Sequence, residues 1–147
     1  MNLTLLGTNI LAFKKDGKNY AMTCAWSTQC EADELVLFIG SQSISAKQLE
    51  VGMKVGYSCL NTKQEKLALE IGSTHSDEID KFKDRDIIEK NGAVIFKDSY
   101  AQAFCEVKKL ATDICDCLLV VLKVIEKNEA NQGLPLSYNE LSKAQEV

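Results

Sequence analysis

The sequence predicts an all-β domain, either a barrel or a sandwich, of six or seven mainly antiparallel strands with two or three short helices. Three observations support this prediction. Short apolar segments rich in Val, Ile and Leu recur along the chain, as in β-strands. Tight-turn signals such as Asp16-Gly17 separate them. Helix signals are few and short, which differs from the strand–helix alternation of a βαβ sheet, and a closed barrel would protect the strand edges.

The composition indicates one globular domain over residues 1–147. A chain of 147 residues buries roughly two-thirds of its unfolded surface in a single core. The net charge is −4, from 17 basic and 21 acidic residues, which argues against a nucleic-acid partner. The N-terminus has no secretory signal, and the longest apolar run, which begins at Cys117, is too short to cross a membrane. We therefore expect a soluble cytoplasmic protein without membrane contact.

Six cysteines raise the question of disulfides or a metal site. No C-x-x-C spacing occurs, and an intracellular chain of this length does not need disulfides. Cys115 and Cys117 fall on one face of a predicted strand, with Cα atoms roughly 6.5 Å apart, a poor distance for a disulfide. We expect buried free thiols and no metal.

In the first half of the chain, apolar runs and turn residues define the strands. The Asp16-Gly17 pair predicts a hairpin, and Gly40 ends a continuous apolar run. The predicted strands are Asn9–Phe13, Asn19–Gln29, Leu35–Ile39 and Lys54–Leu60.

Two short helices are predicted between and after these strands. Ser43 is the expected N-cap of the first, and Gly52 is its stop signal. The segment TKQE is typical of a capping box, in which Thr62 and Glu65 bond reciprocally at the start of the second helix. Gly72 is expected to end that helix.

The second half returns to strands after a polar segment. Residues 73–91 are dense in mixed charge, and we interpret them as loop and short helix, anchored by Ile79, Phe82, Ile87 and Ile88. The later predicted strands are Ala93–Phe96, Tyr100–Leu110 and Ile114–Glu126. The C-terminal tail holds the only proline and is expected to dock as an irregular arm.

The segment NYAMTCAWSTQ, residues 19–29, has two unlike faces. With a period of two, one face is large and apolar, which predicts core positions for Tyr20, Met22, Cys24 and Trp26. The other face carries only small side chains, those of Ala21, Thr23, Ala25 and Ser27. Two interpretations stay open: the small face makes room for a neighbouring helix, or it makes room for a flat ligand.

The segment from Gly40 to Gln48 joins a strand to a helix start and concentrates hydroxyl groups. Helix N-termini present free amide donors and partial positive charge, which suit a phosphate. The candidate phosphate ligands are Ser41, Gln42, Ser43, Ser45 and Lys47. An ordinary capped helix is the alternative, and the segment is not a nucleotide P-loop because it lacks the second glycine.

The sequence contains no recognisable set of catalytic side chains. His75 is the only histidine, and it is either half of a Cys–His nucleophilic pair or, more commonly in such a context, a solvated loop residue. The carboxylates of residues 77–86 alternate with Lys81, Lys83 and Arg85. This alternation is typical of a salt-bridged surface and not of paired glycosidase acids.

Several segments, in order along the chain, carry a family resemblance. They are GKNYAMTCAW (residues 17–26), VLFIGSQSISAKQL, VGYSCLN, HSDEIDKF, AFCEVKKL, DCLLVVLKV and GLPLSY. Over nearly the whole chain they resemble the flavin reductase-like family, FMN-binding proteins of the Greek-key split β-barrel fold that includes flavoredoxin. The chain departs from the family pattern at Ser58, His75 and Cys117, and it lacks the arginine often found near Gln42.

The resemblance implies a homodimer with FMN at the interface. It implies that the phosphate lies on the strand-to-helix turn and that the isoalloxazine ring lies along the small face of residues 19–29. The cofactor-binding residues so implied are Met22, Thr23, Cys24, Ala25, Ser41, Gln42, Ser43, Ser45 and Lys47, with Thr74, His75, Ser76 and Lys81 from the later loop.

The function that the resemblance implies is that of an NAD(P)H:flavin oxidoreductase. A hydride would pass from NAD(P)H through FMN to free flavin or to a redox partner, such as a rubredoxin-like or iron–sulfur protein, and no side chain would be catalytic. One alternative is an FMN-dependent electron-transfer or flavin-binding module without its own NAD(P)H activity. Another is a related barrel that has lost the flavin.

Overall fold

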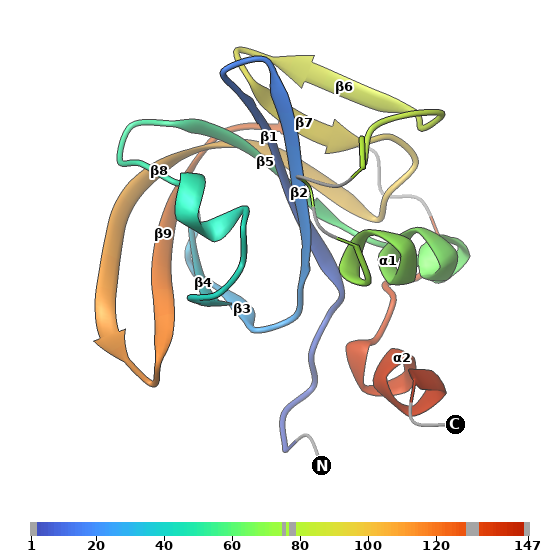
Figure 1. Ribbon diagram of the computed structural model, residues 1–147. Helices are drawn as coiled ribbons and strands as arrows, with labels where there is room; N and C mark the ends of the chain where they lie inside the picture. Colours follow the sequence, from blue (N-terminus) through green and yellow to red (C-terminus); the bar gives the residue numbers. More distant parts are fainter. Residues whose placement is uncertain (1–2, 75, 77–78, 129–132, 146–147) are drawn as a thin grey trace.

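One antiparallel sheet dominates the computed structural model, which describes residues 3–74, 76, 79–128 and 133–145 (Figure 1). Within these residues the sheet has nine strands in the order β3-β4-β9-β8-β5-β1-β7-β6, with β2 beside β1. The prediction of an all-β split barrel is confirmed, although the strands outnumber the six or seven expected. The strands are β1 (Asn9–Lys15), β2 (Lys18–Cys24), β3 (Ser27–Glu31), β4 (Glu34–Gly40), β5 (Lys54–Cys59), β6 (Ile87–Lys90), β7 (Ala93–Phe96), β8 (Ala101–Ile114) and β9 (Cys117–Asn128).

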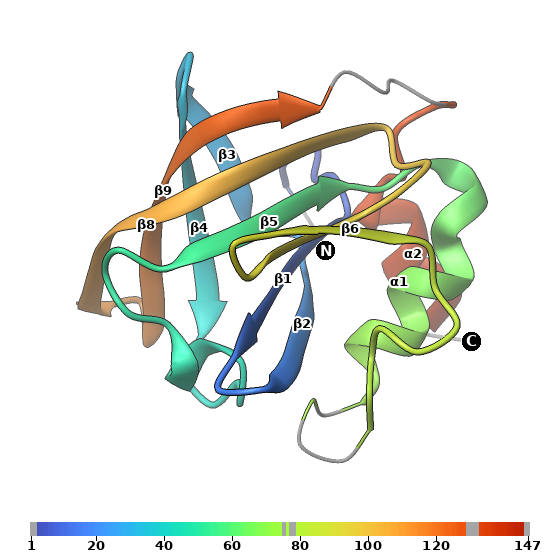
Figure 2. The same ribbon diagram turned by 90° about the horizontal axis from the view of Figure 1, so that it is seen from above.

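Short helices accompany the sheet. They are the 3₁₀ turns η1 (Ala46–Gln48) and η2 (Thr62–Gln64) and the α-helices α1 (Glu65–Gly72) and α2 (Tyr138–Gln145). Both views place α1 and α2 together on the side of the barrel away from the β8–β9 hairpin (Figure 1 and Figure 2). In the part of the chain that the structure describes, no helix is long and apolar enough to cross a membrane.

Two-residue turns form the β1–β2 and β8–β9 hairpins. Asp16 and Gly17 have φ angles of 51° and 75°, as the favoured hairpin turn requires, and the predicted turn is confirmed. In the β8–β9 hairpin the turn residues are Cys115 and Asp116, with φ angles of 52° and 56°. Cys115 therefore lies exposed in the turn. The prediction that it shares a strand face with Cys117 is wrong, because β9 begins only after the turn.

The single strand predicted over residues 19–29 is in fact two strands. β2 pairs with β1, whereas β3 pairs with β4. The chain bends between them, where the amide of Ser27 donates to the carbonyl of Ala25 at 2.9 Å. The bend interrupts the alternation of faces, so Trp26 is 55% exposed and its predicted core position is wrong. Tyr20, before the bend, is buried as predicted.

Both predicted helix starts differ in detail from the observed ones. The capping box is formed by Asn61 and Gln64 instead of Thr62 and Glu65, because the 3₁₀ turn η2 precedes α1. The segment after Ser43 forms only the three-residue turn η1. Neither change alters the order of the elements.

Two segments predicted as irregular contain regular structure. Within residues 73–91, β6 pairs with β7 where loop or helix was expected. The C-terminal tail bridges to the body at Ser137, opposite Gly7, and then forms α2, so the expectation of an irregular arm is wrong for its last part. Leu141 of α2 is buried in the second of the two apolar clusters described next. Such long-range pairing and burial are not visible in the local residue pattern.

Two apolar clusters account for most of the core. The first fills the barrel and includes Phe13, Leu37 and Leu122. The second lies between the outer face of β1, β2 and β7 and the two α-helices, and it includes Ala21 and Ile71. Buried apolar surface contributes roughly 25 cal/mol per Å², so the second cluster holds α1 firmly beside β2.

The backbones of β5 and β7 approach each other at a glycine. A Cβ atom added to Gly56 would lie 1.8 Å from the carbonyl oxygen of Val94, a distance that non-bonded atoms do not reach. Only a residue without a side chain allows this approach. Gly56 is therefore required for the close approach of β5 to β7.

The variant Gly56→Ala is expected to lower the free energy of unfolding by about 3 kcal/mol, the upper part of the usual range for overpacking, because no side-chain rotation relieves a clash with backbone. Chemical denaturation followed by circular dichroism measures the change. Gly40→Ala is the matched control, since a Cβ at Gly40 meets nothing within 4 Å. Equal stability of the two variants would contradict the close approach.

Candidate functional site

β2 has one backbone edge that no strand covers. Within the described residues it pairs only with β1, and side chains bond the amide and carbonyl of Ala21 on the other side. Ser76 Oγ accepts from the Ala21 amide at 3.1 Å, and the Ala21 carbonyl accepts from Lys81 Nζ at 2.8 Å and from Ser45 Oγ at 3.5 Å. The hydroxyl oxygens of Ser45 and Ser76 lie 3.3 Å apart. The free edge thus gathers a polar cluster from two distant segments.

Lys81 is the charged member of this cluster and is only 3% exposed. Its ammonium donates to the carbonyls of Ala21 and Ile71, both at 2.8 Å. Ile71 lies in the last turn of α1, where the carbonyls carry partial negative charge. Burial, and to a smaller extent the nearby Arg85, lowers the pKa of Lys81 from 10.5 to about 8. An ammonium has three N–H groups, and two of them have acceptors among the described residues, which leaves one for a further acceptor.

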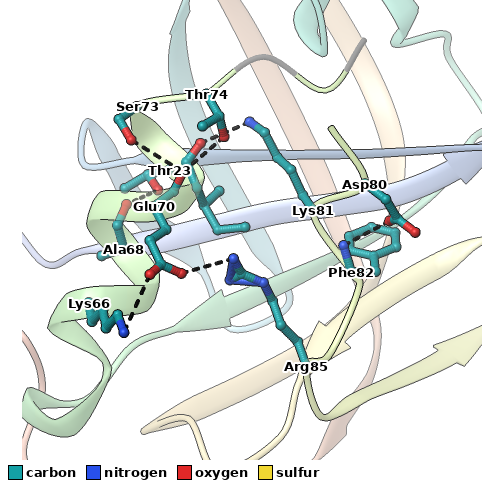
Figure 3. A network of polar contacts seen from close by, with 11 residues as sticks. Thr23, Lys66, Ala68, Glu70, Ser73, Thr74, Asp80, Lys81, Phe82 and Arg85 are labelled. Atoms are coloured by element: carbon teal, nitrogen blue, oxygen red, sulfur yellow. Dashed lines mark hydrogen bonds and ion pairs between the residues drawn. The ribbon is translucent and has the colours of Figure 1, made fainter. Parts of the chain in front are cut away.

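The end of α1 is tied to the segment that carries Lys81 (Figure 3). Arg85 pairs with the Glu70 carboxylate at 3.0 Å. Thr74 Oγ1 donates to the Glu70 carbonyl at 2.9 Å. Because Arg85 is already paired with a carboxylate, Lys81 is the cation that this segment presents to the polar cluster.

Asp80, next to Lys81, ties the same segment to β2. Its carboxylate accepts from the side chain of Asn19 at 2.8 Å and from the amide of Phe82 at 3.0 Å. These hydrogen bonds, that from Asn19 first, lower the pKa of Asp80. Phe82 is buried in the second apolar cluster. Lys81 is therefore held between Asp80 and Phe82, which are both fixed by their own contacts.

Two adjoining hollows follow the free edge of β2. The first, of about 230 Å³, is lined by Ala21, Met22, Thr23, Ser43, Ser45, Ile71, Gly72, Thr74, Ser76 and Lys81. The second, of about 200 Å³, is lined by Met22, Thr23, Cys24, Ala25, Trp26, Phe38, Ile39, Gly40 and Tyr138. Because they share Met22 and Thr23, we treat them as one site and call it the β2 edge groove.

The β2 edge groove brings together most of the predicted site residues. Those that line it are Met22, Thr23, Cys24, Ala25, Ser43, Ser45, Thr74, Ser76 and Lys81. Ser41 and Lys47 line a separate hollow beside Asp116 and Cys117. Gln42 is exposed in a turn, and His75 lies outside the described residues.

The amides of the turn η1 are already bonded within their own segment. Those of Ala46, Lys47 and Gln48 donate to Ser43 Oγ at 3.3 Å, the Ser43 carbonyl at 3.2 Å and the Ser45 carbonyl at 3.1 Å. The expected helix start therefore offers none of these three donors to a phosphate. Hydroxyl groups and Lys81 are the donors at this site instead.

The small face of β2 packs against α1. Ala21 is buried in the cluster that includes Ala68 and Ile71, and Thr23 Oγ1 donates to the Ala68 carbonyl at 2.9 Å. The interpretation that these small residues make room for a helix is confirmed for Ala21 and Thr23. Ala21 and Thr23 also line the β2 edge groove, so they contact both α1 and the groove.

Trp26, Tyr138 and the end of β4 line the groove without having been predicted there. Trp26 is the only tryptophan of the chain, and the bend beside it is what brings it to the groove. Tyr138 comes from α2, so no local pattern indicates its place. Together with Phe38 at the end of β4, they give this part of the groove three aromatic side chains.

The thiols behave differently according to burial. Burial raises the pKa of the Cys24 and Cys105 thiols to about 12, so both stay protonated and poorly reactive at neutral pH. Cys30 and Cys115 are exposed, and the expectation of buried thiols is wrong for them. Among the residues that the structure describes, no group of three or more Cys, His, Asp or Glu side chains is placed to hold a metal.

The chain matches a known family in sequence and known structures in fold. The flavin reductase like domain matches residues 4–145. An FMN-binding protein from Thermus thermophilus has 19% identity and a TM-score of 0.79, over 88% of this chain and 73% of that one. The NADH:FAD oxidoreductase of Streptomyces globisporus C-1027 has 19% identity and a TM-score of 0.76, over 85% and 75%. Flavoredoxin from Methanosarcina acetivorans has 14% identity and a TM-score of 0.79, over 92% and 76%.

No curated protein matches the chain significantly. At identities of 14–19%, the three structures establish a shared fold.

The burial of Lys81 predicts a pH dependence of stability. Its pKa is about 8 in the folded protein against an ordinary value of 10.5, so the unfolded chain binds more protons between these values and stability rises with pH across them. The shift corresponds to at most about 3 kcal/mol. Relative to Lys81→Met, the wild type should therefore gain stability between pH 8 and pH 10.5, as measured by urea denaturation at each pH. Lys83→Met, at an exposed position, should show no such trend, and an identical trend in both variants would contradict the burial of Lys81.

Proposed function

This chain belongs to the flavin reductase-like family, and we propose that it binds FMN in the β2 edge groove. The phosphate would lie at the cluster of Ser45, Ser76 and Lys81, and the ring would extend along β2 toward Trp26. The observation that carries this proposal is the buried ammonium of Lys81, which retains one N–H beside two hydroxyl groups.

The donor set of the cluster suits a phosphate. Charge-assisted hydrogen bonds from an ammonium are stronger than neutral ones, and Ser43, Ser45, Thr74 and Ser76 add hydroxyl groups around the same hollow. Among the residues that the structure describes, none that lines this hollow carries a carboxylate. Ser41, Gln42 and Lys47 are left out of the proposed phosphate site because they do not line it.

The edge of β2 suits the polar side of a flavin ring. Alternate residues of a strand direct their backbone groups to the same edge, so the amide and carbonyl of Thr23 face the same way as those of Ala21. Cys24 and Ala25 continue the wall with small side chains, and Trp26 and Tyr138 supply aromatic surface. Aromatic rings favour offset stacking or edge contact with other rings.

The reaction proposed is that of an NAD(P)H:flavin oxidoreductase. When bound, FMN supplies hydride acceptance from NAD(P)H and passes reducing equivalents to free flavin or to a redox partner such as a rubredoxin-like or iron–sulfur protein. The chain then has to bind the phosphate, orient the ring and limit water at the groove. It requires no acid, base or nucleophile of its own.

We also propose that a second copy of the chain covers the open side of the groove. Trp26 is 55% exposed at the groove, and Leu5 is 97% exposed beside Leu6, whose carbonyl accepts from the amide of Tyr138 at 2.8 Å. Large exposed apolar side chains of this kind are common at protein interfaces. A homodimer would bury them and shield the ring from solvent.

The purified protein is expected to bind added FMN, and NADH or NADPH should then bleach the visible flavin absorbance in the absence of oxygen. Free FMN mixed with either nucleotide is the control for uncatalysed reduction. A protein that binds no FMN would contradict the proposed function. Bound flavin that neither nucleotide bleaches would contradict the reductase activity and favour an electron-transfer or flavin-binding module.

A further inference from the structure

A separate hollow, of about 390 Å³, lies where the barrel interior opens beside β1, β5 and β8. It shares no lining residue with the β2 edge groove. Leu35, Tyr57 and Val124 line it and also pack against the cluster that fills the barrel. We call it the barrel-mouth hollow. Sites of this size, mostly apolar with a few polar groups, are typical of small-molecule binding in the mouths of β-barrels.

Small residues in β8 create the space. Tyr57 of β5 pairs with Ala103 of β8, which pairs in turn with Lys127 of β9. In the next row, Cys59 of β5 pairs with Ala101 of β8. Residues opposite each other in antiparallel strands project from the same face, so both alanines sit in the floor of the hollow where larger side chains would fill it.

The hydroxyl groups of Ser27 and Tyr57 together carry one proton more than the hydrogen bond between them uses. Ser27 Oγ accepts from Asn9 Nδ2 at 3.0 Å and lies 2.7 Å from the hydroxyl of Tyr57. The bond between the two hydroxyls uses one of their two protons. In the part of the chain that the structure describes, neither hydroxyl has another acceptor, so one O–H is free to donate into the hollow.

One charged side chain is found at the hollow within the described part of the chain. It is that of Lys127, which is exposed, and none of the described lining residues carries a carboxylate. Burial raises the pKa of Tyr57 well above its ordinary value, so its hydroxyl keeps its proton at neutral pH. A ligand there meets a donor, a cation at the rim and the apolar side chains of Leu35 and Val124.

We propose that the barrel-mouth hollow is a second ligand site, which binds a small aromatic carboxylate. The ring would pack against Tyr57, Leu35 and Val124, and the carboxylate would accept from the Ser27–Tyr57 pair and lie near Lys127. This site is independent of the proposed flavin site, because the two share no residue.

The test is calorimetric titration of the full chain with benzoate and, separately, with benzylamine, which carries the opposite charge on a similar ring. Benzoate should bind at least tenfold more tightly than benzylamine. The variant Ala103→Leu, which fills the floor, should abolish benzoate binding, and Ser27→Ala combined with Tyr57→Phe should weaken it about tenfold, as expected for a lost hydrogen bond to a charged acceptor. Tyr100→Phe, outside the lining, is the matched control and should bind benzoate like the wild type.

FMN affinity should be the same in Ala103→Leu and in the wild type, which separates this site from the flavin site. Lys127→Glu, at the exposed rim, gives a second readout if Ala103→Leu does not fold, and it should also weaken benzoate binding about tenfold. Equal affinities for benzoate and benzylamine, absence of benzoate binding, or unchanged benzoate binding in Lys127→Glu would each overturn the proposal.

Discussion

The free backbone edge of β2 is the constraint on which the candidate site depends. A buried or half-buried strand edge needs partners for its amides and carbonyls, and here side chains supply them. The Ala21 carbonyl alone accepts from Lys81 Nζ at 2.8 Å and from Ser76 Oγ at 3.2 Å. The same hydrogen bonds also give these side chains a purely structural role, because they satisfy the backbone amide and carbonyl at the edge of β2. The spare N–H of Lys81 is what distinguishes a ligand site from an edge that is merely covered.

The rest of the fold holds this edge in position. Gly56 allows β5 and β7, which both pair with β1, to approach each other closely, and β1 carries β2 as its hairpin partner. The second apolar cluster fixes the end of α1, where the Ile71 carbonyl accepts a hydrogen bond from Lys81 Nζ. The site is therefore assembled from β2, the end of β4 and the turn after it, the end of α1 and the segment after it, and the start of α2. No single segment of sequence contains it.

Local signals predicted much of the fold but not its pairing. The Asp16-Gly17 turn and the strand Ala93–Phe96 were found from residue type and apolar pattern, because turn geometry and β propensity are local. The bend at Trp26, the strand β6 and the helix α2 were not found. Each depends on contacts between segments distant in sequence, which no short window of residues contains.

The sequence indicated some residues of the site but not how the fold brings them together. Hydroxyl groups before η1 stood out in the sequence, yet only the fold separates Ser43 and Ser45, which line the groove, from Ser41, which does not. Lys81 lies in a segment of alternating charge that is typical of a solvated surface, so its burial was not visible from composition. Its connection with the site came from the family resemblance alone.

In the proposed site Lys81, and not Lys47, holds the phosphate of FMN. The most direct test measures the affinities of the wild type, Lys81→Met and Lys47→Met for FMN and for riboflavin, which lacks the phosphate. Lys81→Met is expected to lose about tenfold or more of the preference for FMN, as expected for a charge-assisted hydrogen bond, while Lys47→Met keeps it. Loss of the preference in Lys47→Met, with the preference intact in Lys81→Met, would contradict a phosphate site at Lys81.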